Sequence, residues 1–199
     1  MLISCDVSSV VIDSLCDRAK GQEVAVACFY FDFAARKEQS SVSMLGAVLK
    51  QIVSGLEKVP EEIAQAYEDQ GKVIGGREPQ LADIVKMLQT IASEKPTFIC
   101  IDALDECVAR CRVKLLDSIN QILQRSPGTR MFVTGRPHIQ AEVGNRLSGR
   151  VMTISITPRK NDIISYLHNR LDEDVRPDAM DSSLKADILK KIPQDTSEM

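Results

Sequence analysis

The sequence predicts an α/β fold with a mainly parallel sheet. Four short apolar runs, rich in Val, Ile and Phe, indicate strands, and the segments between them carry apolar residues at helical spacing. Two of the runs are apolar on both alternate faces, which is typical of buried strands in parallel sheets. Because the strands alternate with helices of crossover length, we expect βαβ units with right-handed connections.

The composition is that of an ordinary globular protein. The chain has 199 residues, of which 44% are hydrophobic and 27% charged, and its net charge of -3 gives no indication of nucleic-acid binding. No apolar stretch reaches the roughly 20 residues that span a bilayer, so no membrane partner is expected. Since Cys28 and Cys100 lie in strand-like runs and the chain opens with no secretory signal, we interpret the six cysteines as reduced thiols of a cytoplasmic protein.

The first part of the chain is predicted to hold three helices and one strand. Residues 8–20 have helical spacing and precede Gly21, a helix stop. Residues 23–33 indicate a buried strand. Residues 42–56 form a second helix, with Ser40 and Ser41 as candidate caps, and a third helix begins at Pro60 and continues to residue 70.

The rest of the chain continues the alternation. The predicted elements are a helix over 81–91, strand 97–102, helix 115–123, strand 129–134, a short helix over 138–147, strand 151–156, a helix over 163–171 capped by Asn161 or Asp162, and a helix over 184–192. The polar end at 194–199 is expected to be frayed. We therefore expect one domain over residues 1–172 and the start of a following helical segment over 173–199.

The strand at 97–102 ends in an acidic cluster of Asp102, Asp105 and Glu106. Ligands bind at the carboxyl edge of a parallel sheet, and carboxylates beside an apolar interior need a positive partner. Hydrated Mg²⁺ with nucleotide phosphates fits this position, with Asp102 as the metal-binding residue and Glu106 and Asp105 as the candidate catalytic residues that orient or activate water. The alternative is that Asp105 and Glu106 only supply charge at the start of the next helix, which contributes about 0.3–1 kcal/mol.

Arg136 follows the next predicted strand, in the sequence Thr134-Gly135-Arg136-Pro137. In the following βαβ unit this strand end lies beside Asp102, where the planar guanidinium of Arg136 can contact a terminal phosphate. Arg136 is therefore the candidate nucleotide-binding residue. Two alternatives stay open: a solvated loop residue, or an ion-pair partner of Asp105 or Glu106.

Four stretches together resemble the NACHT domain of STAND-class P-loop NTPases, in the nephrocystin-like N-terminal group of fungal multidomain proteins. They are FICIDALDEC, TRMFVTGRP, CFYFDF and SMLGAVLKQIV. The resemblance covers residues 8–172 and implies a P-loop NTPase-like three-layer sandwich with strand order five-one-four-three-two. It also implies that the acids bind Mg²⁺ and support ATP or GTP hydrolysis, that Arg136 senses the nucleotide, and that effector and sensor-repeat domains or self-association complete a signalling switch.

The sequence departs from that family at its start. Residues 1–7 occupy the place of the Gly-rich phosphate loop and contain neither Gly nor Lys. We therefore expect the first strand and the phosphate loop to be missing, and binding of Mg²⁺ with ATP or GTP to be weak or absent in this chain. One hypothesis is a partial nucleotide switch from a larger protein, and another is a non-catalytic α/β interaction module, a degenerate remnant of a NACHT domain. A third is an unrelated α/β domain whose acids only cap a helix.

Overall fold

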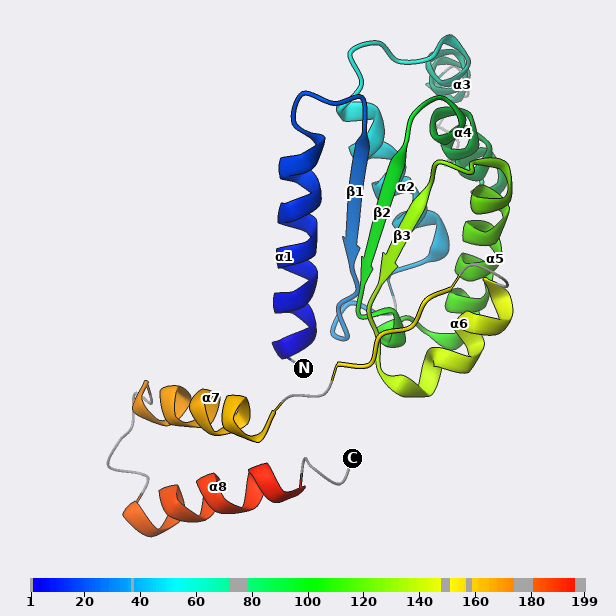
Figure 1. Ribbon diagram of the computed structural model, residues 1–199. Coiled ribbons are helices and arrows are strands. Elements are labelled where there is room, and N and C mark those ends of the chain that lie inside the picture. Colours follow the sequence, from blue (N-terminus) through cyan, green and yellow to red (C-terminus); the bar gives the residue numbers. More distant parts are fainter. Residues whose placement is uncertain are drawn as a thin grey trace. The chain divides into compact units, whose positions relative to one another are not determined.

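The computed structural model describes residues 2–36, 38–71, 79–147, 151–156, 159–173 and 181–195. It forms two compact units, Met1–Val151 and Met152–Met199. The domain boundary expected between residues 172 and 173 stays a prediction. The elements shown in Figure 1 are α1 (Leu2–Ala19), β1 (Ala25–Tyr30), α2 (Ser41–Ser54), α3 (Glu61–Gly71), α4 (Leu81–Glu94), β2 (Thr97–Asp102), η1 (Leu104–Glu106), α5 (Ala109–Arg125), β3 (Arg130–Val133), η2 (Pro137–Ile139), α6 (Gln140–Arg146), α7 (Lys160–Asp172) and α8 (Ser182–Asp195).

The first unit is built on a sheet of three parallel strands in the order β1-β2-β3. Residues 25–30 pair with 97–102, and residues 98–101 pair with 130–133. This confirms the predicted α/β class with a parallel sheet. The three strands are neighbours in chain order, and the full order five-one-four-three-two that the resemblance implies stays a prediction.

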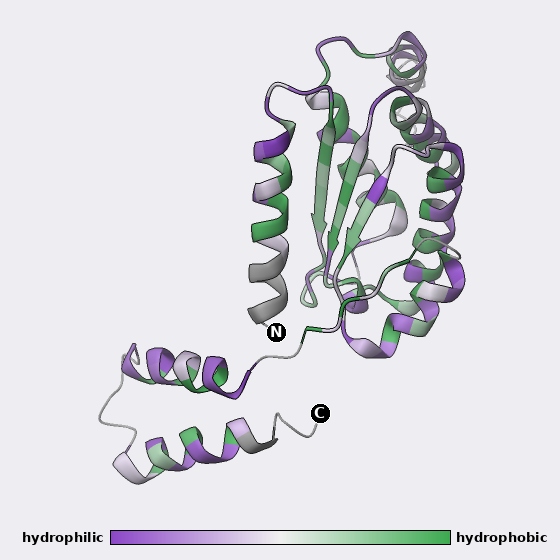
Figure 2. Ribbon diagram, viewed as in Figure 1, coloured by the Kyte–Doolittle hydropathy of each residue, from purple (hydrophilic) through white to green (hydrophobic). Residues whose placement is uncertain are grey.

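Helices cover both faces of this sheet. Ala27, Ile99 and Ile101 point to one face, where they join a buried core with apolar residues of α2, α4 and α5. Asp102 is on the opposite face because side chains alternate along a strand, and α1 contacts β1 and β2 on that side. The strands are hydrophobic along most of their length (Figure 2), as expected for a sheet covered on both faces.

Several predicted helix ends are confirmed and others are wrong. Ser40 caps α2, because its hydroxyl accepts a hydrogen bond from the Ser43 amide while the Ser43 hydroxyl accepts one from the Ser40 amide. The helix expected from residue 8 begins at Leu2. The cap expected at Asn161 or Asp162 is wrong: α7 begins after Arg159, whose backbone amide donates to Asp162 Oδ2 at 3.3 Å.

The strand expected at 151–156 is also wrong. This segment has no regular secondary structure, and all six residues are exposed. A strand exists only where a neighbouring strand accepts and donates its backbone hydrogen bonds. The pattern of apolar residues in 151–156 indicated strand propensity but carries no information about whether such a neighbour is present.

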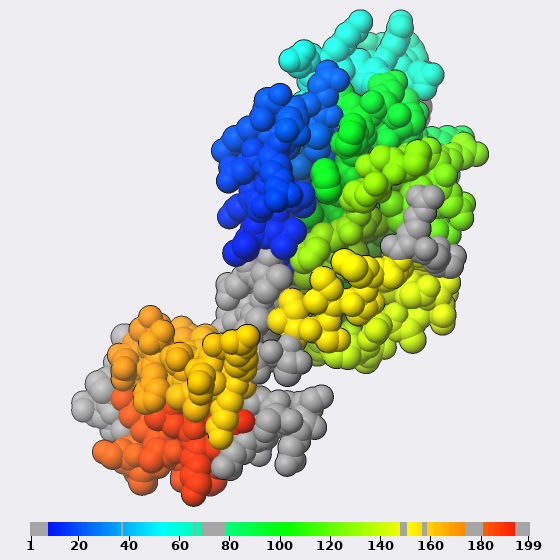
Figure 3. All heavy atoms as spheres, in the orientation of Figure 1, coloured from blue at the N-terminus to red at the C-terminus, as the bar shows by residue number. Residues whose placement is uncertain are grey.

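In the second unit, α7 and α8 pack against each other (Figure 3). α8 ends at Asp195, so the first two residues of the tail expected to be frayed are helical, and residues 196–199 lie outside the described part. None of the helices within the described ranges is long and apolar enough to cross a membrane.

Candidate functional site

The carboxyl ends of β2 and β3 meet at one edge of the sheet, and a strained turn follows β2. Asp102, the last residue of β2, is 2% exposed. Ala103 comes next with left-handed backbone angles, φ 52° and ψ 46°, and no other non-glycine residue in the described ranges has a positive φ. A left-handed alanine costs roughly 1–2 kcal/mol. Backbone strain of this kind is concentrated at functional sites, so this edge of the sheet is a candidate functional site.

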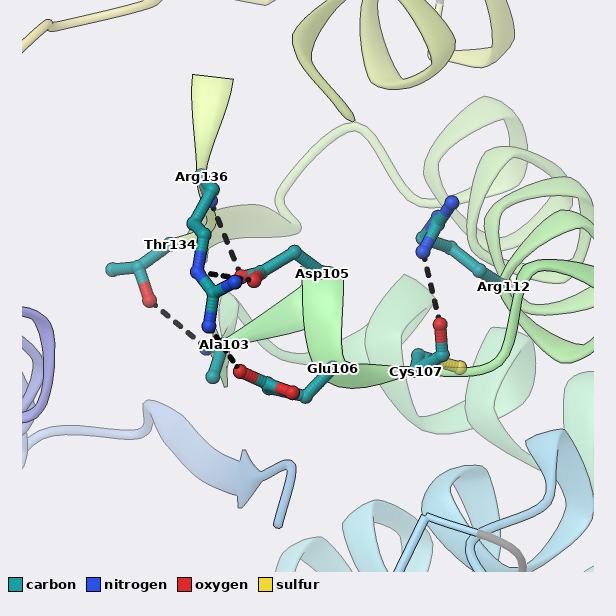
Figure 4. A network of polar contacts seen from close by, with 7 residues as sticks. All are labelled: Ala103, Asp105, Glu106, Cys107, Arg112, Thr134 and Arg136. Carbon is teal, nitrogen blue, oxygen red and sulfur yellow. Dashed lines mark hydrogen bonds and ion pairs between the residues drawn. The ribbon is translucent and has the colours of Figure 1, made fainter. Parts of the chain in front are cut away.

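Two hydroxyl groups hold the Asp102 carboxylate. Ser8 of α1 donates from its Oγ to Asp102 Oδ1, and Thr134 donates from its Oγ1 to the same oxygen at 2.6 Å. The Thr134 hydroxyl also accepts a hydrogen bond from the Ala103 amide at 3.0 Å (Figure 4). Thr134 therefore joins the buried acid, the strained turn and the end of β3, while Ser8 connects α1 to the same carboxylate.

Arg136 forms ion pairs with the other two acids. Its Nε lies 3.2 Å from Asp105 Oδ2 and its terminal nitrogen Nη2 lies 2.7 Å from Glu106 Oε1 (Figure 4). The Asp105 and Glu106 side chains are 5% and 10% exposed, whereas that of Arg136 is 59% exposed. One largely exposed guanidinium thus faces two nearly buried carboxylates.

The backbone of the loop after β3 also approaches the acids. The Arg136 amide donates to Asp105 Oδ1 at 3.2 Å. Gly135 permits this approach: a Cβ there would lie 2.7 Å from Ile139 Cδ1 and 3.4 Å from Asp105 Oδ1. A larger residue at position 135 would therefore displace the end of the Ile139 side chain and lie against the acid.

Arg112, on α5, fixes the chain directly after the acidic turn. Its Nη1 donates to the Cys107 carbonyl oxygen at 2.9 Å, and its Nε and Nη2 contact Glu142 Oε2 of α6 at 2.9 and 2.8 Å. The arginine side chain is only 10% exposed. Burial, together with the neighbouring Cys111, raises the pKa of the Cys107 thiol to about 12, so this thiol is neutral at physiological pH.

The structure brings all four predicted site residues to this one edge. Asp102 ends β2, Asp105 and Glu106 lie on η1, and Arg136 pairs with both of the latter, as one of the alternatives for this arginine predicted. Their metal-binding, catalytic and nucleotide-binding roles stay predictions.

Sequence reasoning missed Ser8, Ala103 and Arg112 as members of this site. A signal was available for Arg112, because it interrupts the buried face of α5 that Leu115 and Ile119 continue. Ser8 carried none, since its partner Asp102 lies 94 positions further along the chain.

Comparison with known proteins identifies the family. The family described as Nephrocystin 3, N-terminal, matches residues 7–136, a stretch that begins in α1 and ends at Arg136. No curated protein and no solved structure matches the chain. The match covers more than half of the 199 residues and includes every predicted site residue. The chain therefore belongs to the nephrocystin 3 N-terminal domain family.

Proposed function

We propose that the edge formed by the ends of β2 and β3 binds Mg²⁺ together with the phosphates of ATP or GTP, as part of a NACHT-type signalling domain. The observation that carries this proposal is the convergence of Asp102, Asp105, Glu106 and Arg136 at the carboxyl edge of a parallel sheet. Carboxylate oxygens are the ligands that Mg²⁺ prefers, and an arginine fork suits a phosphate. The donor set therefore fits the proposed ligand.

Each residue has a distinct role in this proposal. Asp102 holds the hydrated ion, and its orientation is set by the Ser8 and Thr134 hydroxyls. Glu106, with Asp105 beside it, accepts a proton from or orients the attacking water. Arg136 contacts the terminal phosphate, and its 59% exposure leaves the guanidinium free to turn from the acids towards solvent. Bound Mg²⁺ supplies charge neutralisation on the phosphates.

The proposed domain works within a larger assembly. The resemblance to NACHT domains implies that the bound nucleotide controls the contacts of this domain with other protein domains or with further copies of itself. The P-loop NTPase-like three-layer arrangement belongs to the same proposal, and the parallel sheet with helices on both faces supports it.

A second candidate is a non-catalytic interaction module, and one observation favours it. Asp102 accepts from two hydroxyls, and Asp105 and Glu106 share Arg136, so each of the three acids has a partner within the chain. Across the part of the chain that the structure describes, no group of three or more His, Cys, Asp or Glu residues is arranged to hold a metal ion. In this alternative the network only stabilises the turn after β2.

Titration of the isotopically labelled chain with ATP or GTP, with and without Mg²⁺, separates the two candidates. Because affinity is expected to be weak, the experiment uses nuclear magnetic resonance at millimolar nucleotide. Asp102→Asn and Glu106→Gln remove charge from the proposed site. Asp117→Asn is the matched control, since Asp117 lies on α5 and pairs at 2.7 Å with Arg146.

Saturable, Mg²⁺-dependent shifts of the residues around Asp102 support the proposal if the two site variants abolish them and Asp117→Asn does not. Shifts that persist in both site variants overturn the assignment of the site. No shifts at any nucleotide concentration overturn the nucleotide-binding role and leave the interaction module.

A further inference from the structure

β1 forms one edge of the sheet in the part of the chain that the structure describes (Figure 1). The amides of Ala25 and Phe31 donate to carbonyls at or directly before the ends of β2, at 2.9 and 3.1 Å, so the odd-numbered residues direct their backbone groups towards β2. Because these directions alternate along a strand, the amide and carbonyl of Cys28 point outward near the middle of β1. Backbone groups that point outward in this way can pair with a strand of another protein molecule.

The sequence of β1 makes an open edge hazardous. The strand reads AVACFY, six residues without charge, proline or glycine. Segments of this composition are the ones that pair between molecules into aggregates. The nearest charged residues along the chain, Glu23 and Asp32, stand outside the strand. β1 therefore has no charged side chain of its own that would discourage pairing.

The side chain of Gln51, on α2, occupies this edge. The Cys28 amide donates to Gln51 Oε1 at 3.0 Å, and Gln51 Nε2 donates to the Cys28 carbonyl at 2.8 Å. The carboxamide thus supplies the acceptor and the donor that the backbone of a neighbouring strand would supply. Gln51 is exposed, whereas Val48 and Ile52 of the same helix are buried. The two hydrogen bonds, rather than burial in the core, therefore hold the Gln51 side chain against the strand.

We propose that Gln51 blocks the edge of the sheet: it occupies the backbone groups of Cys28 and so prevents β1 from pairing with an extended strand of another protein molecule. A strand that adds to β1 must first displace the carboxamide, and both hydrogen bonds are lost before new ones form at this position. The alternative is that Gln51 only ties α2 to the sheet, in which case breaking the contact lowers stability and nothing else. The proposal does not depend on nucleotide binding.

Three variants of the whole chain separate these two roles. Gln51→Ala is too short to reach Cys28, keeps a good helix former in α2 and adds no long apolar side chain. Gln51→Lys also removes the acceptor for the Cys28 amide, but it places a positive charge at the edge, which by itself discourages strand pairing. Gln89→Ala is the matched control, because Gln89 of α4 donates to the Gln121 carbonyl of α5 at 3.0 Å, a contact between two helices.

Three measurements are made on each variant. Hydrogen exchange followed by nuclear magnetic resonance shows whether the Cys28 amide is still hydrogen-bonded in the soluble chain. Thioflavin T fluorescence and sedimentation over a concentration series detect aggregates, and hydrogen exchange within the aggregates locates the strand that pairs. Urea unfolding followed by circular dichroism gives the free energy of unfolding and checks that each variant is folded.

We expect exchange of the Cys28 amide to quicken about tenfold in both Gln51 variants, since each loses the acceptor of this amide. Gln51→Ala should form aggregates that bind thioflavin T and in which the amides of Val26 and Tyr30, which also point outward, gain protection against exchange. The wild type, Gln89→Ala and Gln51→Lys should stay soluble at the same concentrations. Solubility of Gln51→Lys would show that charge can replace the carboxamide at this edge, which a purely structural tie does not predict.

The proposal is overturned if Gln51→Ala stays as soluble as the wild type, or if Gln51→Lys aggregates as readily as Gln51→Ala. Aggregates that leave the Val26 and Tyr30 amides unprotected also overturn it, because β1 is then not the strand that pairs. An unchanged exchange rate of the Cys28 amide would contradict the contact itself. If Gln51→Ala does not fold, Gln51→Ser, which is also too short to reach the strand, takes its place and the same outcomes decide.

Discussion

Replacing Thr134 by valine tests how much the hydroxyl network at the sheet edge stabilises the fold. Valine keeps the shape of threonine but removes the hydrogen bond to Asp102 Oδ1 at 2.6 Å, and it deprives the Ala103 amide of its acceptor at 3.0 Å. A hydrogen bond to a charged group contributes about 1.5–3 kcal/mol, and an unsatisfied buried donor costs about 1–3 kcal/mol. Because Ser8 still donates to Asp102, we take the lower part of both ranges and expect a loss of about 3 kcal/mol.

Thr129 provides the matched control immediately before β3. Its hydroxyl oxygen is buried and has no hydrogen-bond partner in the described part of the chain. Thr129→Val therefore removes an unsatisfied polar group, and the free energy of unfolding should stay the same or rise by about 1 kcal/mol. Thr134→Ser retains the hydroxyl and should recover most of the stability that Thr134→Val loses.

Two measurements check this prediction. Urea unfolding followed by circular dichroism gives the free energy of unfolding of each variant. Hydrogen exchange measures the local stability at the Ala103 amide. This amide should lose its protection against exchange in Thr134→Val and keep it in Thr129→Val. If Thr134→Val is no less stable than Thr129→Val and the Ala103 amide keeps its protection, the network does not have the role that its geometry indicates.

Two further predictions concern the same turn. Ala103→Gly should raise the free energy of unfolding by about 0.5–1 kcal/mol, because relief of the left-handed strain outweighs the greater freedom of glycine in the unfolded chain; a loss of stability in urea unfolding would contradict the observed φ of 52°. The native pKa of Cys107, about 12, lies above the ordinary 9.0, so its contribution to stability is fully present below about pH 9 and is lost as the pH rises towards 12. Over that interval the urea midpoint should fall more steeply for the wild type than for Cys107→Ala, and equal slopes would refute this.

The central strand and its acids were predictable because one local pattern specifies both. An apolar run followed by Asp102 can be buried only as an interior strand whose carboxyl end reaches the edge of the sheet, and β2 has the bounds expected for it. β1 is shorter than the apolar run around it, since pairing with β2 ends at Tyr30 although the run continues to Phe33. Apolar composition predicts burial, whereas the partner strand decides where the ladder stops.

Features that depend on distant parts of the chain were not predictable. The strand expected at 151–156 has no described neighbour to pair with, so its β propensity produces no strand. The hydrogen bond from Ser8 to Asp102 joins residues 94 positions apart. The left-handed conformation of Ala103 is supported by the Thr134 hydroxyl, and alanine itself gives no sign of it.

The ion pairs of Arg136 relate the two proposed functions through charge. Asp105 and Glu106 are nearly buried, so their carboxylates require a neighbouring cation under either proposed function. Arg136 itself is largely exposed, so water can solvate its guanidinium when it turns away from the two nearly buried acids. The guanidinium can therefore leave the acids at little cost, provided that another cation takes its place. If the edge binds nucleotide as proposed, Mg²⁺ held at Asp102 would supply that charge and Arg136 would move to the phosphate, whereas in the interaction module Arg136 would stay where it is. The two functions thus differ in whether the buried carboxylates exchange their cation.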